Sequence, residues 1–318
     1  MSLSILLNLG ETALQLGLIC SLTVLALFLS YSMLNVCDLS TDGCFTLGAC
    51  VGAVVAISGH PFLSIPAAML AGVLSGFVTA FLQTRMGVDS LLAGIIVNTA
   101  LYSVNIAVMG GSSLLNMNKT DTVFTLLKDA LGNSPLKNRN ILIVVIIAVM
   151  LIVLFLTLFL RTRLGLAIRA TGNNQDMVKS SSINPVFTTT VGLCVANSFT
   201  GLSGCLLGQA QKSVSIDIGT GMLTMALASL LIGNTFMGKG SIFKRAVGVV
   251  LGSVIFRIVY TIALRFNMPA FMLKFVSSVI VVIAISGPYL KSQYPTLLRR
   301  IEAKKNSKLG EKGGRENA

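Results

Sequence analysis

The chain has 318 residues, of which 54% are hydrophobic and 11% are charged, and its formal net charge is +13. Soluble domains carry about 25% charged residues, so the composition excludes an ordinary soluble enzyme. It also excludes a nucleic-acid-binding protein, because the positive charge lies in loops and in the C-terminal tail and not on a folded basic face.

Nine apolar stretches, separated by short polar breaks, make up more than half of the chain. A helix needs about 20 apolar residues to cross the roughly 30 Å hydrocarbon core of a bilayer. Barrel strands would alternate apolar and polar residues, and the run from Ile141 to Leu160 does not. The chain is therefore predicted to be an all-α, polytopic transmembrane helix bundle of about nine spans. The stretches are residues 12–34, 43–59, 62–84, 90–109, 140–160, 184–211, 218–238, 246–264 and 275–290.

The polar break between the first two stretches, residues 38–43, is long for a turn between two spans. It predicts an irregular segment that dips into the membrane, which is tolerated only where the backbone lines protein or water. Asp38, Ser40 and Asp42 in this segment are candidate residues of a translocation pathway.

Further pathway candidates lie in or at the ends of later stretches. Asp89 precedes the fourth stretch, and Asn98 and Asn234 lie in or at the ends of apolar spans. Amides at such positions also bond between helices, and this alternative stays open. Arg257 lies just past the middle of the eighth stretch, where it either faces a water-filled path, snorkels outward or pairs with a backbone carbonyl.

The longest connection, residues 110–139, joins the fourth and fifth stretches. Apolar residues recur in it at spacings of three and four, which predicts a short amphipathic helix over residues 122–131. Glycines and a proline on either side act as breakers. We expect this helix to lie at the outer surface of the membrane.

The connection after the fifth stretch, residues 161–184, is the second informative one. Gly172 is expected to break the chain, and Asn173 to cap a short helix that has Asp176 near its positive end. Serines 180 to 182 and Pro185 would end that helix. A two-turn helix is therefore predicted at the cytoplasmic surface, beyond the apolar core of the membrane.

Four pairs of glycines recur at a spacing of four residues within the apolar stretches. Helices in a bilayer pack through close backbone approach at small residues, so these pairs predict helix contacts within one bundle or, alternatively, between two chains. The pairs are Gly48 and Gly52, Gly72 and Gly76, Gly204 and Gly208, and Gly248 and Gly252.

No catalytic or metal centre is predicted. The single histidine, His60, supports neither a nucleophile triad nor a metal site. Residues 233–239 match the start of a phosphate-binding loop, but Gly240 follows where Ser or Thr is needed for magnesium. We therefore expect no enzyme activity and no cofactor bound by this chain.

Basic residues are distributed unequally between alternate loops, with 16 on one side of the membrane and 6 on the other. The side richer in Lys and Arg is expected to be cytoplasmic, which places the N-terminus outside and the C-terminus inside. Residues 1–290 form the predicted membrane domain. Residues 291–318 form a basic cytoplasmic tail that is predicted to be disordered.

Three segments resemble the permease subunits of ATP-binding-cassette (ABC) importers of the branched-chain amino acid and ribose type, with tryptophan/tyrosine-type permeases the most similar. The most specific is Leu164–Asn174, which fits the pattern G-x-x-x-R-A-x-G-x-N that leads into a coupling helix in that family. The others are Asp38–Ala49 and a paired glycine-rich segment, which consists of Gly219–Met222, then Ala226–Gly233, then Gly238–Ser241.

The resemblance implies a type II importer in the plasma membrane, with the solute translocated between two permease chains, most simply a homodimer. Two cytoplasmic ATPase subunits would hold ATP and Mg²⁺, and an extracellular or lipid-anchored binding protein would deliver the solute. A helix at about residues 171–183 would be the coupling helix that contacts the ATPase. Its expected contact residues are Arg169, Thr171, Gly172, Asn173, Asn174, Asp176 and Met177.

The solute that the resemblance implies is an amino acid, such as tryptophan or tyrosine. An ABC importer for a sugar or nucleoside is an alternative within the same class. An ion-coupled secondary transporter is an alternative from another class, although no internal repeat supports it.

Overall fold

The computed structural model describes residues 3–130, 140–237 and 240–264, together with single positions between 275 and 286. The N-terminal helix α1 (Leu3–Leu27) continues into a π-helix, η1 (Phe28–Met33). The other elements, in chain order, are α2 (Thr41–Ile57), α3 (Ser64–Thr84), α4 (Ser90–Val108), β1 (Leu114–Asn116), α5 (Val123–Ala130), α6 (Asn140–Phe159), α7 (Arg163–Asn173), α8 (Gln175–Ser180), α9 (Pro185–Gln211), β2 (Ser213–Ser215), α10 (Met222–Met237) and α11 (Ile242–Leu264).

The prediction of an all-α membrane bundle is confirmed, but two of the predicted spans are short. Within the described ranges, six helices are long and apolar enough to cross a bilayer, and α2 and α10 are shorter apolar helices of 17 and 16 residues. At 1.5 Å per residue these two extend only about 24–26 Å. The predicted ninth span and the tail lie largely or wholly outside the described residues.

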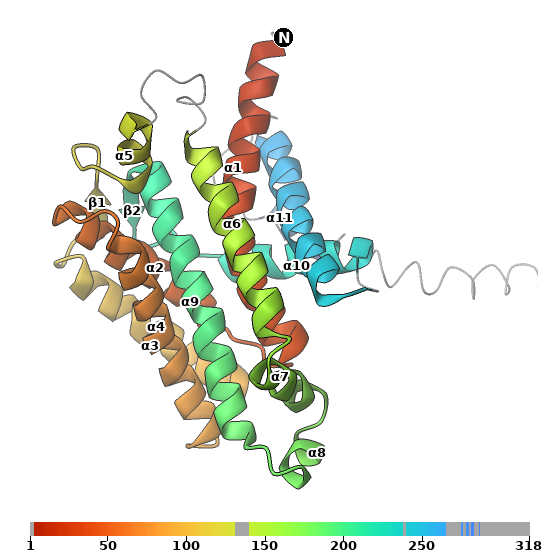
Figure 1. Ribbon diagram of the computed structural model, residues 1–318. Helices are drawn as coiled ribbons and strands as arrows, with labels where there is room; N and C mark the ends of the chain where they lie inside the picture. Colours follow the sequence, from red (N-terminus) through yellow and green to blue (C-terminus); the bar gives the residue numbers. More distant parts are fainter. Residues whose placement is uncertain are drawn as a thin grey trace, which may run out of the picture.

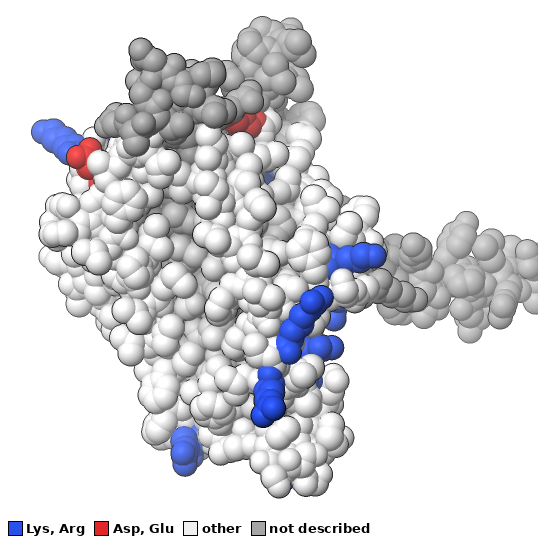
Figure 2. Space-filling view, viewed as in Figure 1, with Lys and Arg blue, Asp and Glu red and all other residues white. Residues whose placement is uncertain are grey.

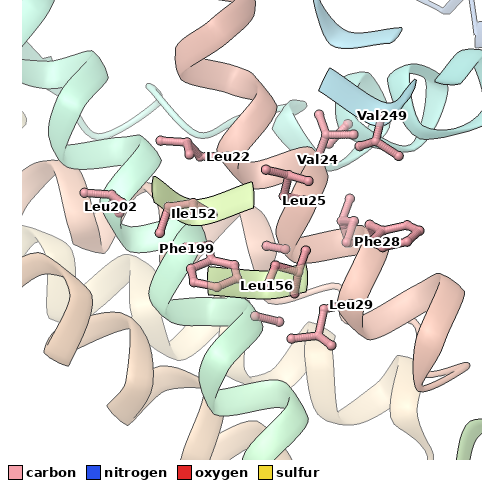
Figure 3. Packing of buried hydrophobic residues seen from close by; sticks show 14 of the residues in the cluster. Leu22, Val24, Leu25, Phe28, Leu29, Ile152, Leu156, Phe199, Leu202 and Val249 are labelled. Atoms are coloured by element: carbon pink, nitrogen blue, oxygen red, sulfur yellow. The ribbon is translucent and has the colours of Figure 1, made fainter. Parts of the chain in front are cut away.

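Helix α9 forms the centre of the bundle, and 83% of its most apolar window is buried. It packs against α1, α2 and α3, and Figure 1 shows it running between the two ends of the molecule. The main apolar core lies between α1, α6, α9 and α11. Figure 3 shows Leu25 of α1 near Leu156 of α6, whereas Phe28 of η1 points toward the side on which Val249 of α11 lies.

The glycine pairs pack helices within this bundle, as one of the two readings predicted. A Cβ atom built on Gly48 of α2 would overlap the backbone of Gly201 in α9, and one on Gly204 would overlap the backbone at Phe45. Gly72 of α3 approaches α9 at Asn197 in the same way. These close approaches let α2 and α3 lie directly on α9.

A two-stranded antiparallel ribbon and a short helix cover one end of the bundle. Strand β1 pairs with β2 so that Leu115 lies opposite Val214, and helix α5 confirms the amphipathic helix predicted over residues 122–131. Helices α7 and α8 lie at the opposite end of the molecule (Figure 1). The two ends are therefore built differently, one from a ribbon and one from a helical hairpin.

Candidate functional site: a polar cavity inside the bundle and a hairpin at one end

The chain between η1 and α2 is irregular, as predicted, and is anchored by Asp38. This carboxylate is 2% exposed and accepts hydrogen bonds from the Ser40 backbone N–H at 2.8 Å and the Ser40 hydroxyl at 2.6 Å. Its second oxygen accepts one from the Asn197 amide of α9 at 2.7 Å. Asp38 and Ser40 therefore hold this segment against α9, behind the cavity described next.

Asp42, in the first turn of α2, bridges to the start of α10. Its two carboxylate oxygens accept hydrogen bonds from the backbone N–H groups of Gly221 at 2.9 Å and Leu223 at 2.7 Å. A carboxylate at this position is favoured by the partial positive charge of a helix N-terminus. Figure 1 shows α10 at mid-height, tilted strongly from the direction of α9. The two short helices thus begin near each other, inside the bundle.

Asn98 of α4 closes the start of α2 from the other side. Its Oδ1 accepts a hydrogen bond from the Gly43 backbone N–H at 2.7 Å. Asn105, two turns farther along α4, donates through its Nδ2 to the Gly43 carbonyl at 3.2 Å. Two amides of α4 therefore hold the first turn of α2. This is the bonding between helices that the sequence analysis gave as the alternative to a pathway role.

These groups border a cavity of about 300 Å³ between α2, α4 and the segment that joins β2 to α10. Two of the predicted pathway residues, Asp42 and Asn98, line this cavity. Sequence reasoning did not propose the remaining lining residues as pathway residues. The lining consists of Asp42, Gly43, Thr46, Asn98, Thr99, Tyr102, Asn105, Ile216, Asp217 and Thr220.

The missed residues could have been found only in part. Asp217 lies two residues before the glycine-rich segment that precedes α10, and Thr220 lies within that segment. A carboxylate at the edge of an apolar stretch is a signal of function. Thr99 and Tyr102 carry no such signal, because a helix tolerates both on a lipid-facing or a protein-facing side. Interrupted helices that meet near mid-depth are typical of solute sites in transporters.

The other predicted pathway residues lie apart from this cavity. Asp89 is exposed and caps α4 by accepting a hydrogen bond from the Leu91 backbone N–H at 2.9 Å. Asn234 lies near the end of α10, away from the cavity lining. Arg257 lies 5.3 Å from the ring centre of Tyr260 and borders a separate, much smaller cavity.

At the end of the molecule opposite the ribbon, the structure corrects the expected start of the inner helix. Gly172 does not break the chain but lies inside α7, which runs to Asn173. The cap of α8 is Asn174, whose Oδ1 accepts from the backbone N–H groups of Asp176 and Met177, both at 3.0 Å. The prediction that Asn173 is the cap was therefore wrong by one residue, because the ladder of α7 continues through Gly172 to Asn173.

Helix α7 is fixed to the bundle through its small residues. A Cβ atom built on Gly172 would overlap the backbone of Met33 and Leu34, at the end of η1. The hydroxyls of Thr171 and Thr188 lie 2.8 Å apart, which ties α7 to the start of α9. Gly172 and Thr171 therefore face the bundle and are not surface residues.

The remaining residues predicted for coupling lie at or near the surface. Asn173, Asn174, Asp176 and Met177 are exposed, and Arg169 is half-buried. Figure 2 shows several Lys and Arg side chains on the half of the molecule that carries this end. The end that carries α7 and α8 is thus basic and offers a short exposed helix to a partner.

Comparison with known proteins gives a family match over most of the chain. Residues 11–285 match the model of the permease component of the branched-chain amino acid transport system. A tyrosine transport system permease protein of Clostridioides difficile is 29% identical over 298 residues, which cover 93% of this chain and 95% of that protein.

Other relatives match less closely. An uncharacterized protein of Rickettsia prowazekii is 28% identical and covers 88% of this chain and 98% of its own length. The ribose import permease of Escherichia coli is 25% identical and covers 69% of this chain and 66% of its own length. No solved structure gives a significant match.

Proposed function

This chain belongs to the family of branched-chain amino acid transport permeases, and we propose that it carries an amino acid through the membrane as the permease subunit of an ATP-driven importer. It is a multi-pass transport component of the type II ABC importer class and not a catalytic subunit. The family match sets aside the ion-coupled secondary transporter that the sequence left open.

The observation that carries the proposal is the polar cavity at the start of α2 and α10. Of its ten lining residues, all except Gly43 and Ile216 carry a polar side chain, in a chain that is 54% hydrophobic. Polar groups within a membrane bundle are costly unless they bond to each other, to water or to a solute. A cavity of about 300 Å³ is large enough for a small ligand.

An amino acid similar to tyrosine or tryptophan is the preferred solute. The Clostridioides difficile relative, named as a tyrosine transport permease, supports it over nearly the full length of both chains. The ribose permease of Escherichia coli, which matches over about two thirds, keeps a sugar importer as the second candidate.

The importer would contain a second copy of this chain, two cytoplasmic ATPase subunits that hold ATP and Mg²⁺, and an extracellular binding protein. Helix α8 would contact the ATPase, with Asn173, Asn174, Asp176 and Met177 as exposed contact residues and α7 as its support. In this arrangement the basic end of the molecule faces the cytoplasm, the N-terminus lies outside and the C-terminus inside.

The test begins with purification of the tagged chain from its native membrane in a mild detergent, and identification of the proteins that come with it. The complex is then reconstituted into proteoliposomes with its binding protein outside and Mg-ATP inside. We expect uptake of labelled tyrosine or tryptophan, abolished when the P-loop lysine of the ATPase is replaced. ATP-dependent uptake of ribose alone would favour the second candidate, and uptake without ATP would refute the importer.

A further inference from the structure

Among the residues that the structure describes, the cavity between α2, α4 and residues 216–220 is lined by acidic side chains and by no basic ones. Asp42 and Asp217 both line it, and among its described lining residues there is no Lys, Arg or His. A cavity with carboxylates and no fixed cation attracts a positively charged group and repels an anionic one.

Three backbone donors at the two helix starts are already used. The N–H groups of Gly221 and Leu223 bond to Asp42, and the N–H of Gly43 bonds to Asn98. Free N–H groups at such helix starts would otherwise bind an anion. These three N–H groups are therefore not free to bind a carboxylate or phosphate in the cavity.

Two of the four hydroxyls that line the cavity are also committed as donors. Thr46 donates to the Asp42 carbonyl at 3.0 Å, and Thr99 donates to the Ile95 carbonyl at 2.9 Å. A hydroxyl whose hydrogen is engaged has only its lone pairs left for a ligand. These two threonines thus add acceptors and not donors.

Asn105 provides an independent sign of a missing donor. Its side chain is 1% exposed, and its Oδ1 has no hydrogen-bond partner among the residues that the structure describes, although its Nδ2 is bonded to Gly43. A buried acceptor without a donor costs free energy that a ligand N–H can recover. This orphaned oxygen belongs to a residue that lines the cavity.

From these contacts we propose that the cavity binds the ammonium group of the transported solute, with Asp217, Asp42 and the Oδ1 of Asn105 as acceptors. An ammonium group carries three N–H donors and one positive charge, which matches acceptors on a carboxylate-lined wall. Tyr102, which is 53% exposed and lines the same cavity, adds an aromatic ring that attracts a cation. The inference rests on the proposed importer function and names the group by which the solute is chosen.

The test uses the full chain in lipid nanodiscs and a matched pair of probes. Tyramine carries an ammonium group, and tyrosol is the same molecule with a hydroxyl in its place. We expect millimolar tyramine to raise the melting temperature in a saturable way, since a ligand that binds the folded state stabilises it, and tyrosol to leave it unchanged.

Asp217→Asn is the first variant, because this residue is exposed in a connecting segment and its replacement by the isosteric amide leaves the helix starts intact. It should weaken tyramine binding about tenfold, in line with a lost charge-assisted hydrogen bond. Asp121→Asn is the matched control, since Asp121 is also exposed and lies outside the cavity lining. It should bind tyramine as the parent chain does.

The results separate the two proposals. Equal stabilisation by tyramine and tyrosol, or equal tyramine binding by the two Asp→Asn variants, overturns the ammonium site while tyrosine uptake by the complex would keep the importer function. Uptake of ribose and of no amino acid overturns both. Tyramine-specific stabilisation that Asp217→Asn weakens and Asp121→Asn does not establishes the site.

Discussion

The cavity and the α7–α8 hairpin are held together in opposite ways. At the cavity, Asp42 bonds to Leu223, 181 residues away, and Gly43 bonds to Asn98, 55 residues away. In the hairpin, Asn174 bonds to residues two and three positions along the chain. The cavity depends on contacts between distant parts of the chain, whereas the start of α8 is capped by its own neighbours.

This difference indicates what each region can do. A cavity whose walls come from α2, α4 and the segment before α10 changes shape when those elements move relative to one another, which is what alternating access requires. A locally capped hairpin keeps its shape while it moves and can transmit displacement as a rigid body.

The largest expected effect is that of Asp38→Ala. The change removes the acceptor of Asn197 and Ser40, and a buried polar group left unpaired costs about 1–3 kcal/mol, so we expect a loss of about 2–4 kcal/mol in the free energy of unfolding. Titration with SDS measures it. Asp89→Ala removes an exposed cap and should cost only about 1 kcal/mol. Similar losses for the two variants would contradict the distant-support picture.

Gly172→Ala should have the next largest effect. The added methyl group would overlap the backbone of Met33 and Leu34, and overpacking of this kind costs about 1–3 kcal/mol. We also expect ATP hydrolysis by the complex to continue while solute uptake falls, because α7 can no longer seat on η1. The control is Gly10→Ala, a helical glycine whose new Cβ would meet no atom within 4 Å apart from its own helix turn. Normal uptake in Gly172→Ala would show that the contact between α7 and η1 does not couple ATP hydrolysis to solute uptake.

Asn174→Ala should cost about 1 kcal/mol, the usual loss for an N-cap, and the loss should be confined to α8. Hydrogen exchange at the backbone of Met177 should speed up while exchange in α9 stays unchanged. Asn173→Ala, one residue earlier, should change neither. Faster exchange in Asn173→Ala than in Asn174→Ala would return the cap to the position that the sequence suggested.

Lys179→Ala should have the smallest effect. The pair between Lys179 and Asp176 has an N–O distance of 3.4 Å, and both side chains are exposed, so it contributes a few tenths of a kcal/mol at most. Thermal unfolding should not distinguish the variant from the parent chain at 0.15 M salt. A clear loss of stability would mean that the surface of α8 matters to the isolated chain, contrary to its proposed role toward a partner.

The sequence predicted the bundle well because lipid-crossing helices are specified by length and apolar composition, which are local properties. Eight of the nine predicted stretches correspond to helices in the described part of the chain. The shortness of α2 and α10 was not predicted, since apolar composition does not show where a helix begins inside a membrane. That point is set by Asp42, which satisfies the start of α10 from another helix.

The candidate site was predicted in part. Asp42 and Asn98 were proposed because polar residues in spans are costly, and both line the cavity. Asp38 is also a polar residue near a span, but its carboxylate bonds to Asn197 and does not line the cavity. Arg257 borders a different cavity. Residue type reports that a buried polar group needs a partner, but the partner is known only once the helices are arranged.

The ribbon of β1 and β2 has a consequence for chain length. Its register holds Ser215 opposite Leu114, and Asp42 holds Gly221, so the five residues between them are fixed at both ends. Loops commonly tolerate insertions, but here one extra residue would have to shift the ribbon or withdraw Gly221 from its carboxylate. Among natural variants of this protein, insertions and deletions in this spacer should therefore be selected against.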